Sequence, residues 1–413
     1  MRTSYRGWHV VAVSAIGMST GPGQFAYGSL GLFMVPLAAE FGWSRGGMSL
    51  ALTVHSLALA LANPYCGVLL DRIGARRVLL PSLLAFAALL AAIPLFATQL
   101  WHLWLAFALI GSLAAGANSM PWLRVVSTWF GRRRAFALGV AMAGAGTGFV
   151  YVPPILQATM ETWGWRGAYL LLAATVLMIA VPLAARALDE APSAADLAGR
   201  DEFADGAPPV DADSASQRTD AAARLFADPR VWHLLLIFAL LSFGLYGLLA
   251  HLAPMQRDLG SSAAQAAWLQ SALGVSVVVS RALVERAMDR FFAPHVSALC
   301  FLASAVGIAA LAGGATGAPA FAAVLCVGLS LGAEMDMLAY FASRYFGLAS
   351  FGRAYGVLFT AFLFGTSLGP PAFGHAFEVT GSYSTVLVAC VITTLLACFL
   401  TLGLPRYPTE QPA

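Results

Sequence analysis

Five ionisable side chains lie in stretches of this chain that are otherwise almost entirely apolar: Arg124, Arg281, Glu334, Asp336 and Arg344. A charge in such surroundings is costly unless it is paired or faces water, so these positions are candidates for chemistry. A guanidinium stays charged and can donate two parallel hydrogen bonds to a carboxylate. A carboxyl group held away from water favours its protonated form and can carry a proton. Together these residue types suit the binding of an anion and the carriage of a proton.

The three arginines each have a structural alternative to anion binding. Arg281 precedes Glu285 by four residues, so the two share a helix face and could form an ion pair with each other. Arg124, close to the end of its apolar run, either contacts a bound anion or extends along its aliphatic stem to water. For Arg344, which lies nearer still to a helix end, we favour the contact with water.

The two acids occupy the middle of one apolar run. Asp336, Tyr340 and Arg344 share one helix face by their spacing, whereas Glu334 points elsewhere. We expect one of the two acids to hold the transported proton, and the sequence does not say which. The alternative is a static ion pair with Arg124 or Arg281.

Five further side chains could donate hydrogen bonds to an anion, or could simply pack in the interior. They are Gln24, Tyr27, Tyr151, Tyr246 and His251.

The composition defines the class of protein. Of the 413 residues, 59% are hydrophobic and only 10% are charged, against about 25% charged in soluble domains. The mean hydropathy is +0.77. These values exclude a soluble enzyme, a nucleic-acid binder and a disordered regulator. The five cysteines lack metal-ligand spacing, so we expect neither a metal nor a cofactor.

Twelve apolar runs, separated by Gly, Pro and charged residues, are long enough to cross a bilayer as helices. We predict them at 8–37, 47–70, 77–98, 102–129, 134–157, 167–187, 231–256, 264–287, 295–314, 319–345, 353–378 and 383–404. Residues 188–230 hold ten of the twenty acids and little apolar surface, which is typical of a flexible linker. The expected organisation is a six-helix bundle at 1–187, a cytoplasmic linker at 188–230, and a second six-helix bundle with a short tail at 231–413.

Arginines predict the orientation in the membrane, because cytoplasmic loops are enriched in positive charge. One side carries the clusters Arg72, Arg76 and Arg77, and Arg132, Arg133 and Arg134, whereas the other carries only Arg45, Arg166 and Arg257. Both termini and the linker are therefore expected in the cytoplasm, and the protein in the inner membrane.

The two halves repeat each other. Asp71-Arg72 recurs as Asp289-Arg290, and a Phe-Gly pair ends the fourth run at 130–131 and the tenth at 346–347. Both copies start on the same membrane side, so the repeat is parallel and indicates two pseudo-symmetric bundles.

The segment Gly67-Val-Leu-Leu-Asp71-Arg72-Ile-Gly74-Ala-Arg76-Arg77 resembles the signature between helices 2 and 3 of the major facilitator superfamily. Within that superfamily, Gly7-Trp8, residues 28–33 and residues 132–144 are similar to the monocarboxylate transporter and oxalate:formate antiporter group. The resemblance implies an all-α membrane protein with twelve transmembrane helices.

The resemblance also implies roles for exposed charged residues. Asp71 is expected to pair with an arginine or to cap a helix, and so to lock one conformation. The conformational gate then comprises Asp71, Arg72, Arg76, Arg77, Asp289 and Arg290.

Two departures from the group matter. Its members often carry a Lys in helix 1 or helix 11, where this chain is uncharged near Gly28 and Phe362. The carriers also place an Asp four residues before the helix 8 Arg, and Val277 stands there instead. A doubly charged substrate such as oxalate is therefore disfavoured.

We predict a monomeric secondary transporter that carries a small, monocarboxylate-like organic anion by alternating access, in symport with a proton. The expected substrate contacts are Arg281, Arg124, Tyr27, Gln24, Tyr151 and Tyr246. An antiporter or an efflux carrier for drugs or metabolites is the alternative within transport. A receptor or membrane-embedded enzyme is disfavoured, because no nucleophile–base pair or metal site is evident.

Overall fold

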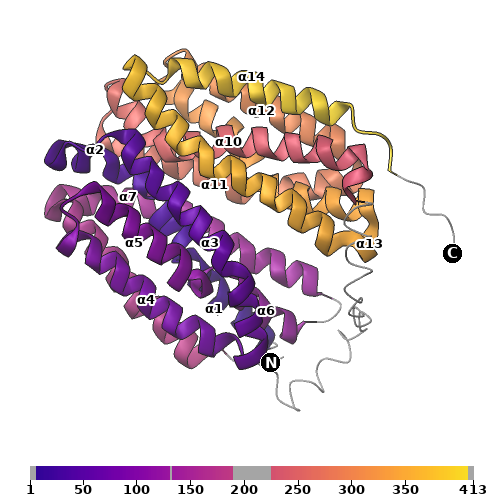
Figure 1. Ribbon diagram of the computed structural model, residues 1–413, viewed down its shortest axis with the longest axis horizontal. Helices are drawn as coiled ribbons and strands as arrows, with labels where there is room; N and C mark the ends of the chain where they lie inside the picture. Colours follow the sequence, from indigo (N-terminus) through magenta and orange to yellow (C-terminus); the bar gives the residue numbers. More distant parts are fainter. Residues whose placement is uncertain (1–5, 131–132, 189–224, 408–413) are drawn as a thin grey trace, which may run out of the picture. The chain divides into compact units, whose positions relative to one another are not determined.

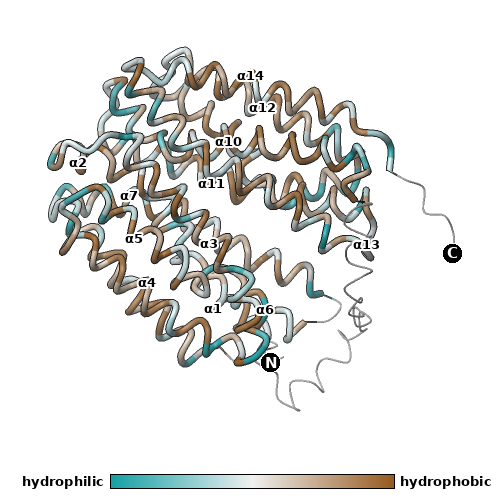
Figure 2. The backbone as a smooth tube through the Cα atoms, in the orientation of Figure 1, coloured by the Kyte–Doolittle hydropathy of each residue, from teal (hydrophilic) through white to brown (hydrophobic). Residues whose placement is uncertain are grey.

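The apolar runs of the sequence form helices. A computed structural model of the chain describes residues 6–130, 133–188 and 225–407, and every regular element in these ranges is helical (Figure 1). A helix pairs its own backbone N–H and C=O groups, which a bilayer interior demands. Figure 2 shows hydrophobic residues along the helices and hydrophilic residues gathered at helix ends and connections.

Two spans in the first half of the chain are interrupted. The first span consists of α1 (Arg6–Ser19), a π-helical turn η1 (Gly23–Tyr27) and α2 (Leu30–Phe41). The fourth consists of α5 (Leu100–Leu113), a 3-10 turn η2 (Ala115–Ala117) and α6 (Ser119–Trp129). We expected continuous helices at 8–37 and 102–129. Helix 1 is interrupted at Gly21-Pro22-Gly23. Glycine loses more conformational freedom in a helix than other residues, and proline has no backbone N–H to donate.

The other spans of this half are longer. They are α3 (Arg45–Ile73), α4 (Ala75–Phe96) and α7 (Arg134–Thr175), the last continued by π-helical turns η3 (Val176–Ala180) and η4 (Leu183–Ala187). α7 comprises two spans, because Gly164 has φ 67° and turns the chain between them. Only glycine adopts this backbone conformation without strain.

The second half contains α10 (Pro229–Asp258), α11 (Ala263–Arg290), α12 (Ala293–Ala312), α13 (Gly317–Thr380) and α14 (Ser384–Leu402). α13 also comprises two spans, since Gly347 has φ 73°. Within the described residues, nine helical segments are long and apolar enough to cross a membrane. One of them divides at Gly164, and the two interrupted spans complete the twelve that the sequence predicts.

The described residues form two compact units. Of these residues, the first unit contains those up to 188 together with 252–274, and the second contains 225–251 and 275–407. Segment 252–274 joins the first unit through polar contacts: the Gln270 amide donates to the Gly28 carbonyl at 2.6 Å, and Arg45 pairs with Asp258. In the second unit α12 packs against α13 and α14.

Most of the predicted linker at 188–230 lies outside the described residues, which omit 189–224.

Candidate functional site

Three helices of the second unit bring the predicted ionisable residues together. α11 carries Arg281, the first span of α13 carries Glu334 and Asp336, and α10 carries Tyr246. Tyr246 lies within electrostatic range of both Glu334 and Arg281. The sequence placed these residues on separate predicted helices, and the structure makes them neighbours.

The Arg281 guanidinium makes its contacts through Nε. Its Nε donates to the Gly332 carbonyl at 3.2 Å and lies 3.8 Å from Asp336 Oδ2. Its two Nη groups have no hydrogen-bond partner among the described residues. The side chain is 18% exposed. Most donors of a permanently charged group are therefore free to meet a ligand.

A close approach of two helices positions this arginine. At Gly332 of α13 an added Cβ would overlap Ser280 Oγ and the Val277 carbonyl oxygen of α11. The missing side chain lets the Gly332 carbonyl reach Arg281 Nε. Four residues before Arg281 stands the uncharged Val277, and the carboxylate partner of Arg281 is Asp336 on another helix.

The two acids lie in different environments. Glu334 is completely buried, and neither carboxyl oxygen has a hydrogen-bond partner. Asp336 is 27% exposed, and its Oδ2 has no hydrogen bond although it faces Arg281. An ionised carboxylate without partners costs several kcal/mol to bury, so the site of Glu334 suits only the neutral acid. Asp336 has both a counter-charge and a route to solvent.

Two further residues belong to this cluster, and the sequence predicted only one of them. Tyr355, on the second span of α13, interacts electrostatically with Asp336. Glu285 of α11 interacts with both Asp336 and Arg281. The sequence predicts Glu285 as a possible ion-pair partner of Arg281. In the structure, the ion pair joins Arg281 to Asp336. A tyrosine among apolar residues gives no signal of its partner in the sequence.

Other predicted polar residues of the second unit have packing contacts. His251 bonds to the Tyr383 hydroxyl at 3.0 Å and the Pro370 carbonyl oxygen at 2.9 Å. The Arg344 guanidinium lies over the Tyr340 ring at 5.6 Å and the Tyr407 ring at 5.3 Å. Tyr246 packs edge-on against Phe362 with ring centroids 5.4 Å apart.

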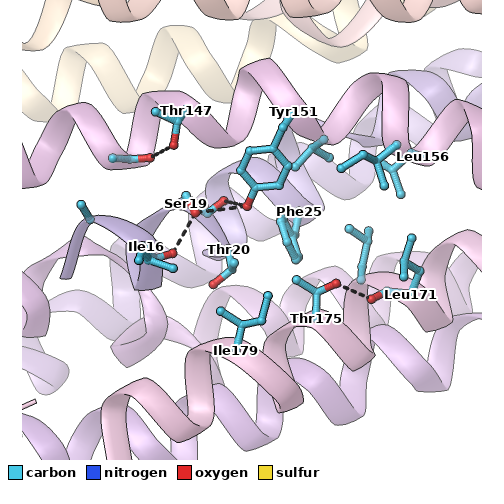
Figure 3. Close-up of a pocket in the computed structure, with 15 residues that line it drawn as sticks. Ile16, Ser19, Thr20, Phe25, Thr147, Tyr151, Leu156, Leu171, Thr175 and Ile179 are labelled. Atoms are coloured by element: carbon cyan, nitrogen blue, oxygen red, sulfur yellow. Dashed lines mark hydrogen bonds between the residues drawn. The ribbon is translucent and has the colours of Figure 1, made fainter. Parts of the chain in front are cut away.

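In the first unit, three of the four predicted substrate contacts lie around the break in helix 1. The Gln24 amide donates to the Ala145 carbonyl at 2.8 Å, and the Tyr27 ring lies 6.3 Å from that of His55. The Tyr151 hydroxyl lies 3.1 Å from Ser19 Oγ and points into a cavity between α1 and α7 (Figure 3). These contacts link α1 and η1 to α7, and η1 to α3.

Arg124 lies in the first unit and is paired with an acid of the expected gate. Its Nη1 donates to Asp71 Oδ1 at 2.5 Å, joining the end of α3 to α6. Arg76 donates to the Ala185 carbonyl oxygen, while Arg72, Arg77, Asp289 and Arg290 are exposed at helix ends. The pairing of Asp71 with an arginine is one of the two contacts that the motif implies.

Comparison with known proteins decides the family. The Major Facilitator Superfamily profile matches residues 16–370 and 254–413. The chain belongs to this superfamily. Monocarboxylate transporter 11 of Mus musculus is 31% identical over 97% of this chain and 88% of its own length. The Homo sapiens protein of the same name is 29% identical, with 97% and 83% covered.

Solved structures of the superfamily share the fold. A bacterial homologue of the human lysosomal transporter Spinster, inward-facing and occupied, superposes with a TM-score of 0.71 at 18% identity. The match covers 98% of this chain and 97% of that one. The chain is thus a multi-pass facilitator-superfamily transporter with the predicted twelve-helix, all-α architecture, and it is related to the monocarboxylate transporters.

Proposed function

We propose that this transporter moves a small monocarboxylate together with a proton, by alternating access. The observation that carries the proposal is Arg281, a half-buried guanidinium with free Nη donors beside a loosely paired Asp336. The names of its relatives, the monocarboxylate transporters, support the same class of substrate.

Asp336 supplies a means of coupling. Without substrate, its carboxylate neutralises Arg281 across 3.8 Å. A proton that binds Asp336 removes this negative charge and leaves Arg281 without a counter-charge. A substrate carboxylate then restores the balance, so the site has the same net charge when empty as when it holds both substrate and proton. The carrier would reorient in these two neutral states and not with the proton or the anion alone.

Glu334 has a different proposed role. Since it has no hydrogen-bond partner and no exposure, it stays protonated through the cycle and can offer an O–H to the bound anion. Tyr246 is the proposed neighbouring donor. Of the two acids that the sequence left open, we assign the transported proton to Asp336.

The remaining residues are assigned by their contacts. Gln24 and Tyr27 stay proposed substrate contacts, because they lie at the break in helix 1, where a discontinuous span exposes backbone groups. Arg124 is bonded to Asp71, so we propose that it serves the cytoplasmic gate with the charged residues around it. Arginine distribution supports an inner-membrane location with both termini in the cytoplasm.

The test is uptake of radiolabelled lactate and pyruvate by the purified protein in liposomes. Arg281→Gln removes the charge and should reduce uptake about 30-fold or more, because a charge-paired contact contributes about 2 kcal/mol or more. Arg286→Gln is the matched control on the same helix, since Arg286 is exposed and bonds the Ala282 carbonyl of its own turn.

The outcomes separate the rival functions. Wild-type uptake by Arg281→Gln would remove this residue from the site. Uptake that requires an internal anion and ignores the pH gradient would indicate an antiporter. If neither lactate nor pyruvate enters the liposomes and uncharged compounds are exported, the protein is an efflux carrier.

A further inference from the structure

The cavity into which Tyr151 points lies in the first unit and is lined by neither an arginine nor a carboxylic acid. It has a volume of about 660 Å³ and is lined by α1, η1, both spans of α7, and η3 (Figure 3). This volume is in the range of small-molecule sites. Its fifteen lining residues include no charged side chain. An organic anion would find no counter-charge here, so this cavity is not the substrate site proposed above.

The hydroxyl groups of the cavity are already used. Ser19 Oγ lies 3.1 Å from the Tyr151 hydroxyl, and each of the two hydroxyl groups has a backbone oxygen of α1 within reach as an acceptor, so both hydrogens have partners. Each threonine in the lining donates to a carbonyl of its own helix: Thr20 to Gly17, Thr147 to Gly144, and Thr175 to Leu171. A stable water needs two to four polar partners. The cavity therefore suits an apolar occupant.

The cavity lies at the depth of the hydrocarbon core. Its residues are 15–25 of the first span, 144–156 of the fifth and 171–179 of the sixth, the middle part of each. Three isoleucines at its rim, Ile16, Ile155 and Ile179, are 47%, 49% and 41% exposed. Exposed apolar residues at this depth contact lipid chains. The rim therefore continues the surface that faces the bilayer, and the wall behind it is apolar and buried.

We propose that the cavity binds one acyl chain of a membrane phospholipid. The chain enters between Ile155 and Ile179 and lies against Phe25, Val152 and Leu156, which are buried in the structure. An unfilled space of this size would deprive its walls of dispersion contacts, and a flexible hydrocarbon chain supplies them. Because Ser19 and Phe25 flank the break in helix 1, the bound chain contacts both sides of that break.

The proposal is tested by photolabelling of the full chain in phosphatidylcholine liposomes. A small fraction of the lipid carries a diazirine midway along one acyl chain, and adducts are mapped by peptide mass spectrometry. Every exposed apolar residue will be labelled to some degree. The expected result is additional labelling of Phe25, Val152 or Leu156, which the structure buries behind the rim.

A variant that fills the cavity makes the test specific. Thr175→Trp should reduce labelling of the buried residues about tenfold, the effect of about 1.4 kcal/mol on occupancy, and leave labelling of the outer surface unchanged. Leu171→Phe is a milder second variant if the tryptophan prevents folding. Leu95→Trp is the matched control, because Leu95 is 65% exposed on α4 and does not line the cavity.

Three outcomes would overturn the proposal. Labelling confined to exposed side chains would mean that no chain enters. Equal labelling of the buried residues in Thr175→Trp and Leu95→Trp would place the lipid elsewhere. Labelling by a diazirine fatty acid but not by the phospholipid would assign the cavity to a free amphiphile. Transport of lactate is not a readout, so the result is independent of the function proposed above.

Discussion

At the scale of single residues, two neighbouring acids, Glu334 and Asp336, lie in environments that suit different roles. Glu334 and Asp336 are two positions apart on α13, and therefore point in different directions. Glu334 is completely buried and has no hydrogen-bond partner, while Asp336 is partly exposed and faces Arg281. Only the second arrangement allows a proton to exchange with water and to change the charge that the substrate meets.

Asp336→Asn imitates the protonated acid permanently. Arg281 then lacks its counter-charge at every pH. We therefore expect the variant still to exchange lactate across the liposome membrane when lactate is present on both sides. Net uptake driven by an inward proton gradient should fall about tenfold or more. Both rates can be measured on one liposome preparation. Full pH-driven uptake by this variant would contradict the assignment of the proton to Asp336.

Glu334→Gln is the companion experiment at the neighbouring acid. If Glu334 is always neutral, its amide counterpart should transport within about twofold of the wild type, with the same pH dependence, because substitutions that leave burial and charge unchanged cost little. The measurement is initial uptake between pH 5.5 and 8. A variant that loses its pH dependence would move the proton from Asp336 to Glu334.

The sequence predicted the candidates at this scale but not their partners. Arg281, Glu334 and Asp336 are conspicuous because charge is rare in apolar runs. Helix periodicity groups Asp336 with Tyr340 and Arg344, yet the contact that matters comes from α11. Contacts between two helices depend on how their faces pack, and this packing cannot be predicted from a single sequence. Tyr355 and Gly332 were missed for that reason.

At the scale of helices, contacts between neighbours position the site and the gate. α11 and α13 meet where Gly332 lies against Ser280 and Val277. α3 and α6 are joined at their ends by Asp71 and Arg124.

Gly332→Ala should separate α11 from α13. The added methyl group overlaps backbone and side-chain oxygens, and overpacking of this kind costs about 1–3 kcal/mol. We expect a lower thermal midpoint and weaker lactate binding, because Arg281 loses its contact with the Gly332 carbonyl. Gly356→Ala is the control on the same helix, where an added Cβ meets nothing within 4 Å. Equal stability of the two variants would show that the close approach is unimportant.

We propose that the Asp71–Arg124 pair acts as a conformational contact more than as a source of stability. The side chains are 78% and 36% exposed, and exposed ion pairs contribute about 0–1 kcal/mol. Asp71→Arg should therefore reduce transport with little change in thermal midpoint. The exchanged pair, Asp71→Arg with Arg124→Asp, should recover part of the rate. No recovery would show that the two residues act separately.

The helix boundaries show what local sequence can and cannot predict. Twelve spans follow from hydropathy, and the turns at Gly164 and Gly347 follow their glycines. The breaks within helices 1 and 4 were not predicted, although Gly21-Pro22-Gly23 carries a local signal for the first. Apolar composition masks such breaks, because both sides remain equally hydrophobic.

At the scale of the whole molecule, composition alone separates this chain from soluble proteins. The internal repeat and the motif around Asp71 then indicate the superfamily, which the profile match shows independently. The identity of the substrate is harder to predict, because it depends on a few side chains from helices distant in sequence. We propose that the substrate is an anion with one carboxylate, because the cluster offers it the single cation of Arg281. The uncharged cavity of the first unit has a separate proposed occupant.

The most direct test of the account is lactate uptake into liposomes that contain the purified protein, with the external pH lower than the internal pH. Symport predicts accumulation of lactate above its external concentration, together with alkalinisation of the external medium. A protonophore that removes the gradient should abolish this accumulation, and Arg281→Gln should show none. Accumulation that persists without a pH gradient, or lactate entry without proton movement, would contradict the account.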